Sequence, residues 1–129
     1  VFKDELPKSW KDLKDIRGYM ITSSSKIASQ VLTSCDANKN IYFTEKQAKS
    51  ALAFAQLSQL VKVLNGDWIP DWNNNREDKY SIVRECTVKD VLIVARFNYS
   101  FRHLAFPTKE LAEFSLLHHK DLWEQYYEL

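Results

Sequence analysis

The sequence predicts an α+β fold with an antiparallel sheet built from two similar halves. Each half is expected to contain three strands followed by a helix, with both long helices packed on one face of the sheet. The first observation is that segments of short strand-like pattern precede each of two long helical segments. The second is that Thr44 and Thr108 each begin a helical segment and are followed at four-residue intervals by an alanine and a leucine. At 129 residues, the chain has the length of one domain.

Residues 1–17 precede the first half and form an N-terminal helical segment in this prediction. Trp10, Leu13 and Ile16 recur every three residues with charged residues between them. This spacing predicts a short amphipathic helix over residues 7–17 that packs as a lid on the core. The helix is expected to end at Gly18.

The first half covers residues 18–65. Residues 18–22 and 26–32 are predicted strands around a serine turn, although the second segment also fits a helical period. Residues 41–43 form a third, short strand. Thr44 is suited to cap the helix that runs from about Glu45 to Leu64, with Gln47 at the reciprocal position of a capping box. Asn65 and Gly66 tolerate the left-handed conformation that ends helices.

Residues 66–78 form a connector, and the second half covers residues 79–129. Alternation predicts strands over residues 79–87 and 91–101, and a short strand over 103–106. Thr108 caps a final helix that runs to about Glu128. Because a threonine cap after a strand is common, the repeat is explained either by duplication or by chance.

The motifs of several enzyme classes are absent from the sequence. Two glycines cannot build a glycine-rich phosphate loop, and no GxSxG or HExxH motif is present. The three histidines lack metal-ligand spacing, so no metal and no cofactor is expected. A hydrolase using His118 and Asp121 is the weakest hypothesis, because an i, i+3 pair is more commonly a contact on a helix surface. We therefore expect a protein that is not an enzyme.

The location of the protein is predicted from segments that the sequence lacks. Residues 1–7 contain no apolar signal segment, and no run of apolar residues is long enough to cross a membrane. Cys35 and Cys86 form no dense framework and are interpreted as reduced thiols. We expect a soluble cytoplasmic protein that has no membrane partner.

The connector supplies the first candidate binding residues: Trp68, Asp71 and Trp72. Two indoles around a proline are costly to leave exposed in a loop. Either both rings pack over the end of the first helix and clamp the connector, or they form an aromatic recognition surface, since tryptophan is enriched at interface hot spots.

Arg84, Arg96 and Arg102 are the second group of candidates. A sheet face that carries arginines and aromatic residues can bind single-stranded nucleic acid. The alternative is a solvated sheet face that the helices leave uncovered. Residues 1–65 carry a surplus of four positive charges and residues 66–129 a deficit of three. This asymmetry is too mild to decide between the two.

Several of these segments resemble one family. They are Gly18-Tyr19, residues 48–60, residues 66–72 and residues 106–114. The family comprises small uncharacterised proteins found in prophages and mobile elements of gut Bacteroides-type bacteria, and the resemblance covers residues 18–129. It implies no activity, but it implies a setting in which the protein acts on a host or phage component inside the cell.

The function expected from the sequence is therefore binding of a host or phage protein, through the exposed sheet face and the two tryptophans of the connector. The alternative is a small nucleic-acid-binding protein that uses Arg84, Arg96 and Arg102. The sequence leaves the oligomeric state open.

Overall fold

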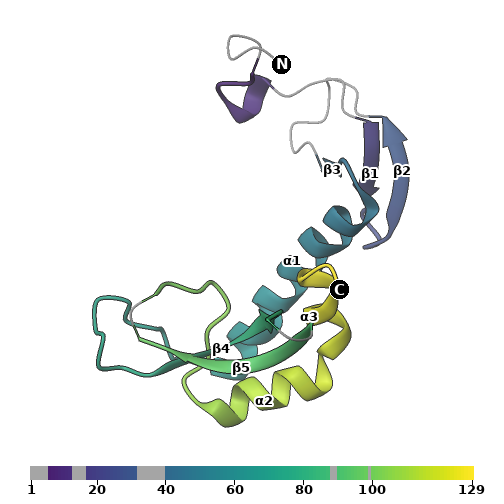
Figure 1. The fold of residues 1–129 in the computed structure, drawn as a ribbon. Coiled ribbons are helices and arrows are strands. Elements are labelled where there is room, and N and C mark those ends of the chain that lie inside the picture. Colours follow the sequence, from purple (N-terminus) through teal and green to yellow (C-terminus); the bar gives the residue numbers. More distant parts are fainter. Residues whose placement is uncertain (1–5, 13–16, 32–39, 88–89, 99) are drawn as a thin grey trace. The chain divides into compact units, whose positions relative to one another are not determined.

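The computed structural model describes residues 6–12, 17–31, 40–87, 90–98 and 100–129. It confirms an α+β protein with small antiparallel sheets (Figure 1). The chain divides into two compact units, Val1–Lys49 and Ser50–Leu129. The elements are β1 (Arg17–Ile21), β2 (Ile27–Val31), β3 (Ile41–Tyr42), α1 (Glu45–Asn65), β4 (Lys79–Glu85), β5 (Val91–Phe97), α2 (Lys109–His118) and α3 (Lys120–Tyr126).

The first unit contains a three-stranded antiparallel sheet in the order β2-β1-β3. Tyr19 of β1 lies opposite Ser29 of β2 on one side and Tyr42 of β3 on the other. Gly18 is required at the β3 side of this sheet. A Cβ atom there would lie 1.8 Å from the carbonyl oxygen of Tyr42, so any side chain would force the two strands apart.

Both predicted threonine caps are present. The Thr44 hydroxyl accepts a hydrogen bond from the Gln47 N–H at 3.0 Å, and the Thr108 hydroxyl accepts one from the Leu111 N–H at 3.2 Å. Each bond satisfies an N–H group that has no partner inside its own helix. The predicted end of α1 is also confirmed, because Gly66 adopts a left-handed φ of +61° directly after Asn65.

The second unit is built on the β4–β5 hairpin. Phe106 lies on the other side of β4, where its N–H donates to the Tyr80 carbonyl and its carbonyl accepts from the Tyr80 N–H. The third strand predicted over residues 103–106 is thus a single bridge. Beside this bridge, the Ser81 hydroxyl donates to the Leu104 carbonyl.

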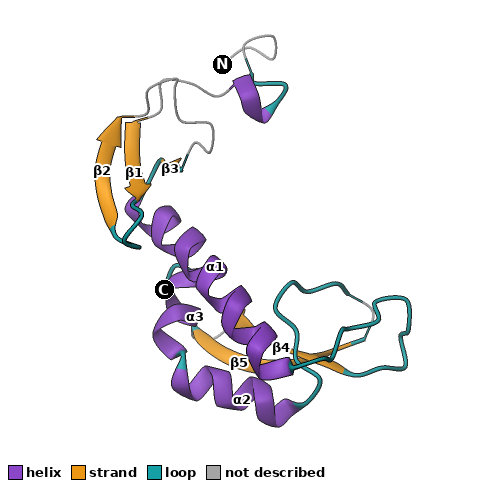
Figure 2. Ribbon diagram, turned by 180° about the vertical axis from the view of Figure 1, so that it is seen from behind, coloured by secondary structure: helices purple, strands orange, loops and turns teal. Residues whose placement is uncertain are grey.

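The core of the second unit lies on one face of this hairpin. Ile82, at the middle of β4, is fully buried together with Phe106. Helices α1, α2 and α3 lie beside the β4–β5 hairpin (Figure 2). The remaining buried members of the cluster come from all three helices and from the 104–106 segment. They are Leu57 and Val61 of α1, Leu104, Ala112 of α2 and Trp123 of α3.

The N-terminal helix predicted over residues 7–17 falls partly outside the described residues, and its described ends are not α-helical. The described part forms only a 3-10 turn over Trp10–Asp12, and Arg17 already belongs to β1. Trp10 is 54% exposed, so it does not cover a core. A helix this short is marginal in water without a packed apolar face. Leu13 and Ile16 lie outside the described residues.

The predicted single final helix is two helices. The break falls at His119, whose φ of −120° and ψ of 28° are not helical. Its ring Nδ1 lies 3.1 Å from the Ser115 hydroxyl, which also accepts from the Trp123 indole N–H at 2.9 Å. The change in direction therefore allows Trp123 to enter the core and to satisfy its indole N–H there.

The strand pattern leaves open whether the two halves share one sheet. The described strands belong to two sheets, one of three strands and one of two. The central strand of each half already has both neighbours from its own half: β2 and β3 flank β1, while β5 and the Phe106 bridge flank β4.

Candidate functional site

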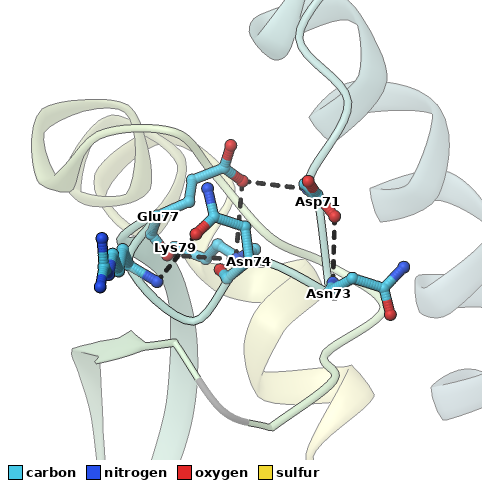
Figure 3. A network of polar contacts seen from close by, with 6 residues as sticks. Asp71, Asn73, Asn74, Glu77 and Lys79 are labelled. Carbon is cyan, nitrogen blue, oxygen red and sulfur yellow. Dashed lines mark hydrogen bonds and ion pairs between the residues drawn. The ribbon is translucent and has the colours of Figure 1, made fainter.

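The connector is an ordered loop that is held by its own polar groups (Figure 3). The Asp71 carboxylate accepts from the Asn73 N–H at 3.0 Å, and the Asp71 N–H donates to the Glu77 carboxylate at 3.0 Å. The Lys79 ammonium donates to the carbonyls of Asn74 at 3.0 Å and Glu77 at 3.1 Å. Asp71, a predicted binding residue, thus has a role in shaping the loop.

Lys79 is the residue on which the loop is built, and sequence reasoning missed it. Its side chain is fully buried, its Nζ lies 3.6 Å from a Glu77 carboxylate oxygen, and it lies 5.1 Å from the centre of the Trp72 ring. A buried ammonium needs such partners, because desolvation of an unpaired charge is costly. The only signal in the sequence was a lysine directly after a loop rich in tryptophan and asparagine.

Trp72 and two residues after β5 form an aromatic cluster. The Trp72 and Phe101 rings are 5.1 Å apart, and the Phe101 and His103 rings are 4.8 Å apart. Phe101 is nevertheless 58% exposed. The Arg102 guanidinium lies 4.4 Å from the centre of the Phe97 ring. We name Trp68, Trp72, Phe101, Arg102 and His103 the connector surface.

Trp68 belongs to this surface through a groove of about 330 Å³. His103 lines the same groove, so it links Trp68 to the cluster around Phe101. Ile69 is 76% exposed at the groove. The other lining residues come from the end of α1 and from the two loops: Ser58, Val61, Lys62, Asn65, Pro70, Leu104 and Ala105. Trp68 therefore packs beside the end of the first helix, whereas Trp72 packs on Phe101.

Arg84 lies at the other end of the hairpin and is fully engaged. Its Nε and Nη2 donate to the two carboxylate oxygens of Asp90 at 2.9 and 2.8 Å, and its Nη1 donates to the Tyr127 carbonyl at 2.9 Å. These hydrogen bonds raise the pKa of Arg84 and lower the pKa of Asp90. The positive charge of Arg84 is matched locally.

Arg84 and Arg96 share a face of the hairpin but lie near its opposite ends. Arg96 is opposite Tyr80, and Arg84 is four residues along β4 from Tyr80, a separation of about 13 Å. Ile82 lies between them on the same face, which the helices cover. Arg96 is 63% exposed and its Nε lies 3.9 Å from Asp78. The structure thus links Trp68 to Trp72 through His103 and Phe101 and places Arg102 on the Phe97 ring, whereas Arg84 is bound to Asp90.

The two residues of the hydrolase hypothesis, His118 and Asp121, are both exposed. His118 is exposed, with its ring 4.3 Å from the Phe114 ring. The partly buried histidine is His119, which contacts the buried Ser115 hydroxyl. This hydroxyl also accepts a hydrogen bond from the Trp123 indole N–H. In the described ranges, no group of three or more histidine, cysteine or acidic residues could hold a metal ion.

No helix in the described part of the chain is both long and apolar enough to cross a membrane. No protein-family model, no curated protein and no solved structure matches this chain.

Proposed function

We propose that this chain is a non-enzymatic cytoplasmic protein of a phage or mobile element, and that it binds a host or phage protein through the connector surface. The observation that carries the proposal is the exposure of Phe101. This ring contacts both Trp72 and His103, yet more than half of it faces solvent. Clustered aromatic residues are the usual anchors of protein interfaces.

The order of the connector supports this proposal. Lys79 and Asp71 hold the loop through hydrogen bonds that are already formed in the free protein. A surface that is ordered before binding loses less conformational entropy when a partner arrives. The groove beside Trp68 offers an adjacent apolar recess for a partner side chain.

The test uses an exposed residue, so that loss of binding is separated from loss of folding. A tagged protein and its Phe101→Ser variant are used to capture partners from host cells at moderate salt. Val63→Ser is the matched control, because Val63 is 78% exposed on α1 and lies outside the connector surface. We expect the wild type and the Val63→Ser control to capture one stoichiometric partner protein. The Phe101→Ser variant should fail to capture it. Equal capture by all three would reject the connector surface.

A nucleic-acid partner is the alternative, and the surroundings of Arg102 and Arg96 favour it. Arg102 stacks on Phe97, and Arg96 is largely exposed with only a long contact to Asp78. Binding of a fluorescent single strand should then weaken steeply as salt rises. Arg96→Ala should reduce it, whereas Arg84→Ala should not, because Asp90 already matches that charge. Absence of binding at low salt would remove this alternative.

We also propose that the two halves share one arrangement of three strands followed by a helix, and that each helix packs on the same face of the strands of its half. In support, the first strand of each half has its hairpin partner on one side and the third segment on the other. Each helix also starts at a threonine whose hydroxyl accepts from the third residue on. An experimental structure in which the 103–106 segment leaves β4 would contradict this.

A further inference from the structure

One edge of the β4–β5 hairpin is open, and the hydrogen bonds on the other edge show which groups it presents. The Tyr80 N–H and carbonyl both bond to Phe106. The peptide groups of Tyr80 therefore point away from β5, and those of its neighbours on β4 point toward β5. Tyr80 is opposite Arg96 in the hairpin. The peptide groups of Arg96 consequently point away from β4, toward the open edge.

The same alternation applies along the whole of β5. Leu92, Val94 and Arg96 direct their N–H and carbonyl groups outward, and Val91, Ile93, Ala95 and Phe97 direct theirs to β4. No described residue hydrogen-bonds to the outward backbone groups of Leu92, Val94 or Arg96. β5 therefore offers a row of unpaired donors and acceptors.

β5 also lacks the features that normally protect an edge strand. Residues 91–95 are all apolar, and the strand contains no proline and no lysine. Ile93, at its centre, is 38% exposed on the face that the helices do not cover. An edge of this kind is suited to pairing with another strand.

The charges at the two ends of β5 indicate which strand fits. Beside its N-terminal end is a groove of about 630 Å³ between β5 and α2, which Leu92, Leu116 and Leu117 help to line. The groove is lined by the carboxylates of Asp90, Glu113 and Glu124 and by the Lys120 ammonium. Two of these carboxylates also pair with cations beside the groove, Asp90 with Arg84 and Glu113 with Lys109. The C-terminal end carries Arg96, which is 63% exposed. In an antiparallel pair of two β5 strands, the Arg96 end of one strand lies beside the acidic end of the other. A second β5 strand therefore has the charges that this edge requires.

We propose that a second copy of this chain pairs with β5 along this edge, antiparallel and with the two-fold axis at Ile93. Residues that lie opposite each other in an antiparallel ladder have their side chains on the same face of the sheet. Even-numbered residues of β5 must therefore pair with even-numbered residues of the second copy, and odd-numbered with odd-numbered. With the axis at Ile93, Leu92 is opposite Val94 of the second copy, and Arg96 is opposite Asp90. The Asp90 carboxylate has lone pairs beyond those that Arg84 uses, so it can accept from both guanidinium groups.

Sedimentation velocity of the full chain over a range of concentrations tests the association. The wild type is expected to form a dimer. Ile93→Lys should raise the dimer dissociation constant at least about tenfold, because two ammonium groups would then meet at the axis. Val63→Lys, with a more exposed side chain outside this edge, should leave it unchanged. A wild type that stays monomeric, or an Ile93→Lys variant that still forms the dimer, would overturn the proposal.

Disulfide formation tests the register. Cys35 and the exposed Cys86 are first replaced by serine. Ile93→Cys should then form a covalent dimer, because residues facing each other in a non-hydrogen-bonded pair have Cα atoms about 4.5 Å apart. Ala95→Cys is the control, since the two copies of residue 95 would lie about 13 Å apart in this register. A covalent dimer with Ala95→Cys in place of Ile93→Cys would overturn the register.

Discussion

Replacing Lys79 with methionine tests whether a buried ammonium holds the connector in place. The substitution keeps the length of the apolar stem and removes two hydrogen bonds to carbonyls, one ion pair to Glu77 and the contact with the Trp72 ring. Hydrogen bonds from a charged donor contribute about 1.5–3 kcal/mol each. The two together contribute about 3–6 kcal/mol before the cost of desolvation is subtracted.

The desolvation of the ammonium works against this gain. Removing a charge from a fully buried site relieves a penalty of several kcal/mol. The freed carbonyls of Asn74 and Glu77 belong to a loop near the surface and can regain water in part. We therefore expect Lys79→Met to lower the free energy of unfolding by about 1–2 kcal/mol. Amide hydrogen exchange in residues 71–78 should become faster at the same time.

Urea unfolding and hydrogen exchange measure the two effects separately. Lys62→Met is the matched control, because Lys62 is exposed and its ammonium makes one hydrogen bond to the Gly66 carbonyl at 2.8 Å. It should change stability by no more than about 0.5 kcal/mol. If Lys79→Met is as stable as the wild type and exchange in the loop is unchanged, the connector does not depend on the ammonium and the reasoning is refuted.

Three further substitutions test the second unit. Thr108→Ala should cost about 1 kcal/mol in urea unfolding, because the Leu111 N–H loses its acceptor; no loss would show that solvent replaces the cap. Trp123→Phe should cost about 2–4 kcal/mol by thermal and urea unfolding, since it removes buried volume and the donor to Ser115. Burial raises the pKa of Tyr127 to about 12, because the folded protein favours the neutral phenol. The contribution of Tyr127 to the free energy of unfolding is therefore complete below about pH 10 and is lost as pH rises toward 12. The Tyr127→Phe variant should lack this loss of stability at alkaline pH. If its stability depended on pH in the same way as that of the wild type, Tyr127 would not be the cause of the loss.

The sequence allowed the α+β class, the threonine caps and the end of α1 to be predicted, because each depends on local chemistry. A threonine hydroxyl reaches the N–H three residues on regardless of the rest of the fold. Gly66 takes a left-handed φ that most other residues avoid. The break at His119 could not be predicted, because it depends on where Trp123 finds a partner for its indole.

The candidate site was predicted only in part for the same reason. Alternation along each strand identifies the residues that share a face with Arg84 or with Arg96, but it cannot give the register between β4 and β5 or say which face the helices cover. The partner of Arg84 is Asp90, which lies in the predicted turn between the two strands, and the strand pattern alone does not pair these two residues. Lys79 was treated as the first residue of a strand, since burial of an ammonium depends on a loop that folds back over it.

The contacts of the connector surface explain which substitutions can separate binding from folding. The rings of Trp72, Phe101, His103, Phe54 and Tyr126 follow one another at centroid separations of 4.8–5.7 Å. The connector surface is therefore continuous with the aromatic residues around the core of the second unit. Trp72→Ala should lower stability, because it also removes the ring beside the buried Lys79 ammonium. If Trp72→Ala left the melting temperature unchanged while partner capture was lost, the packing role of Trp72 would be wrong. Phe101 offers a cleaner test of binding, because most of its ring already faces solvent.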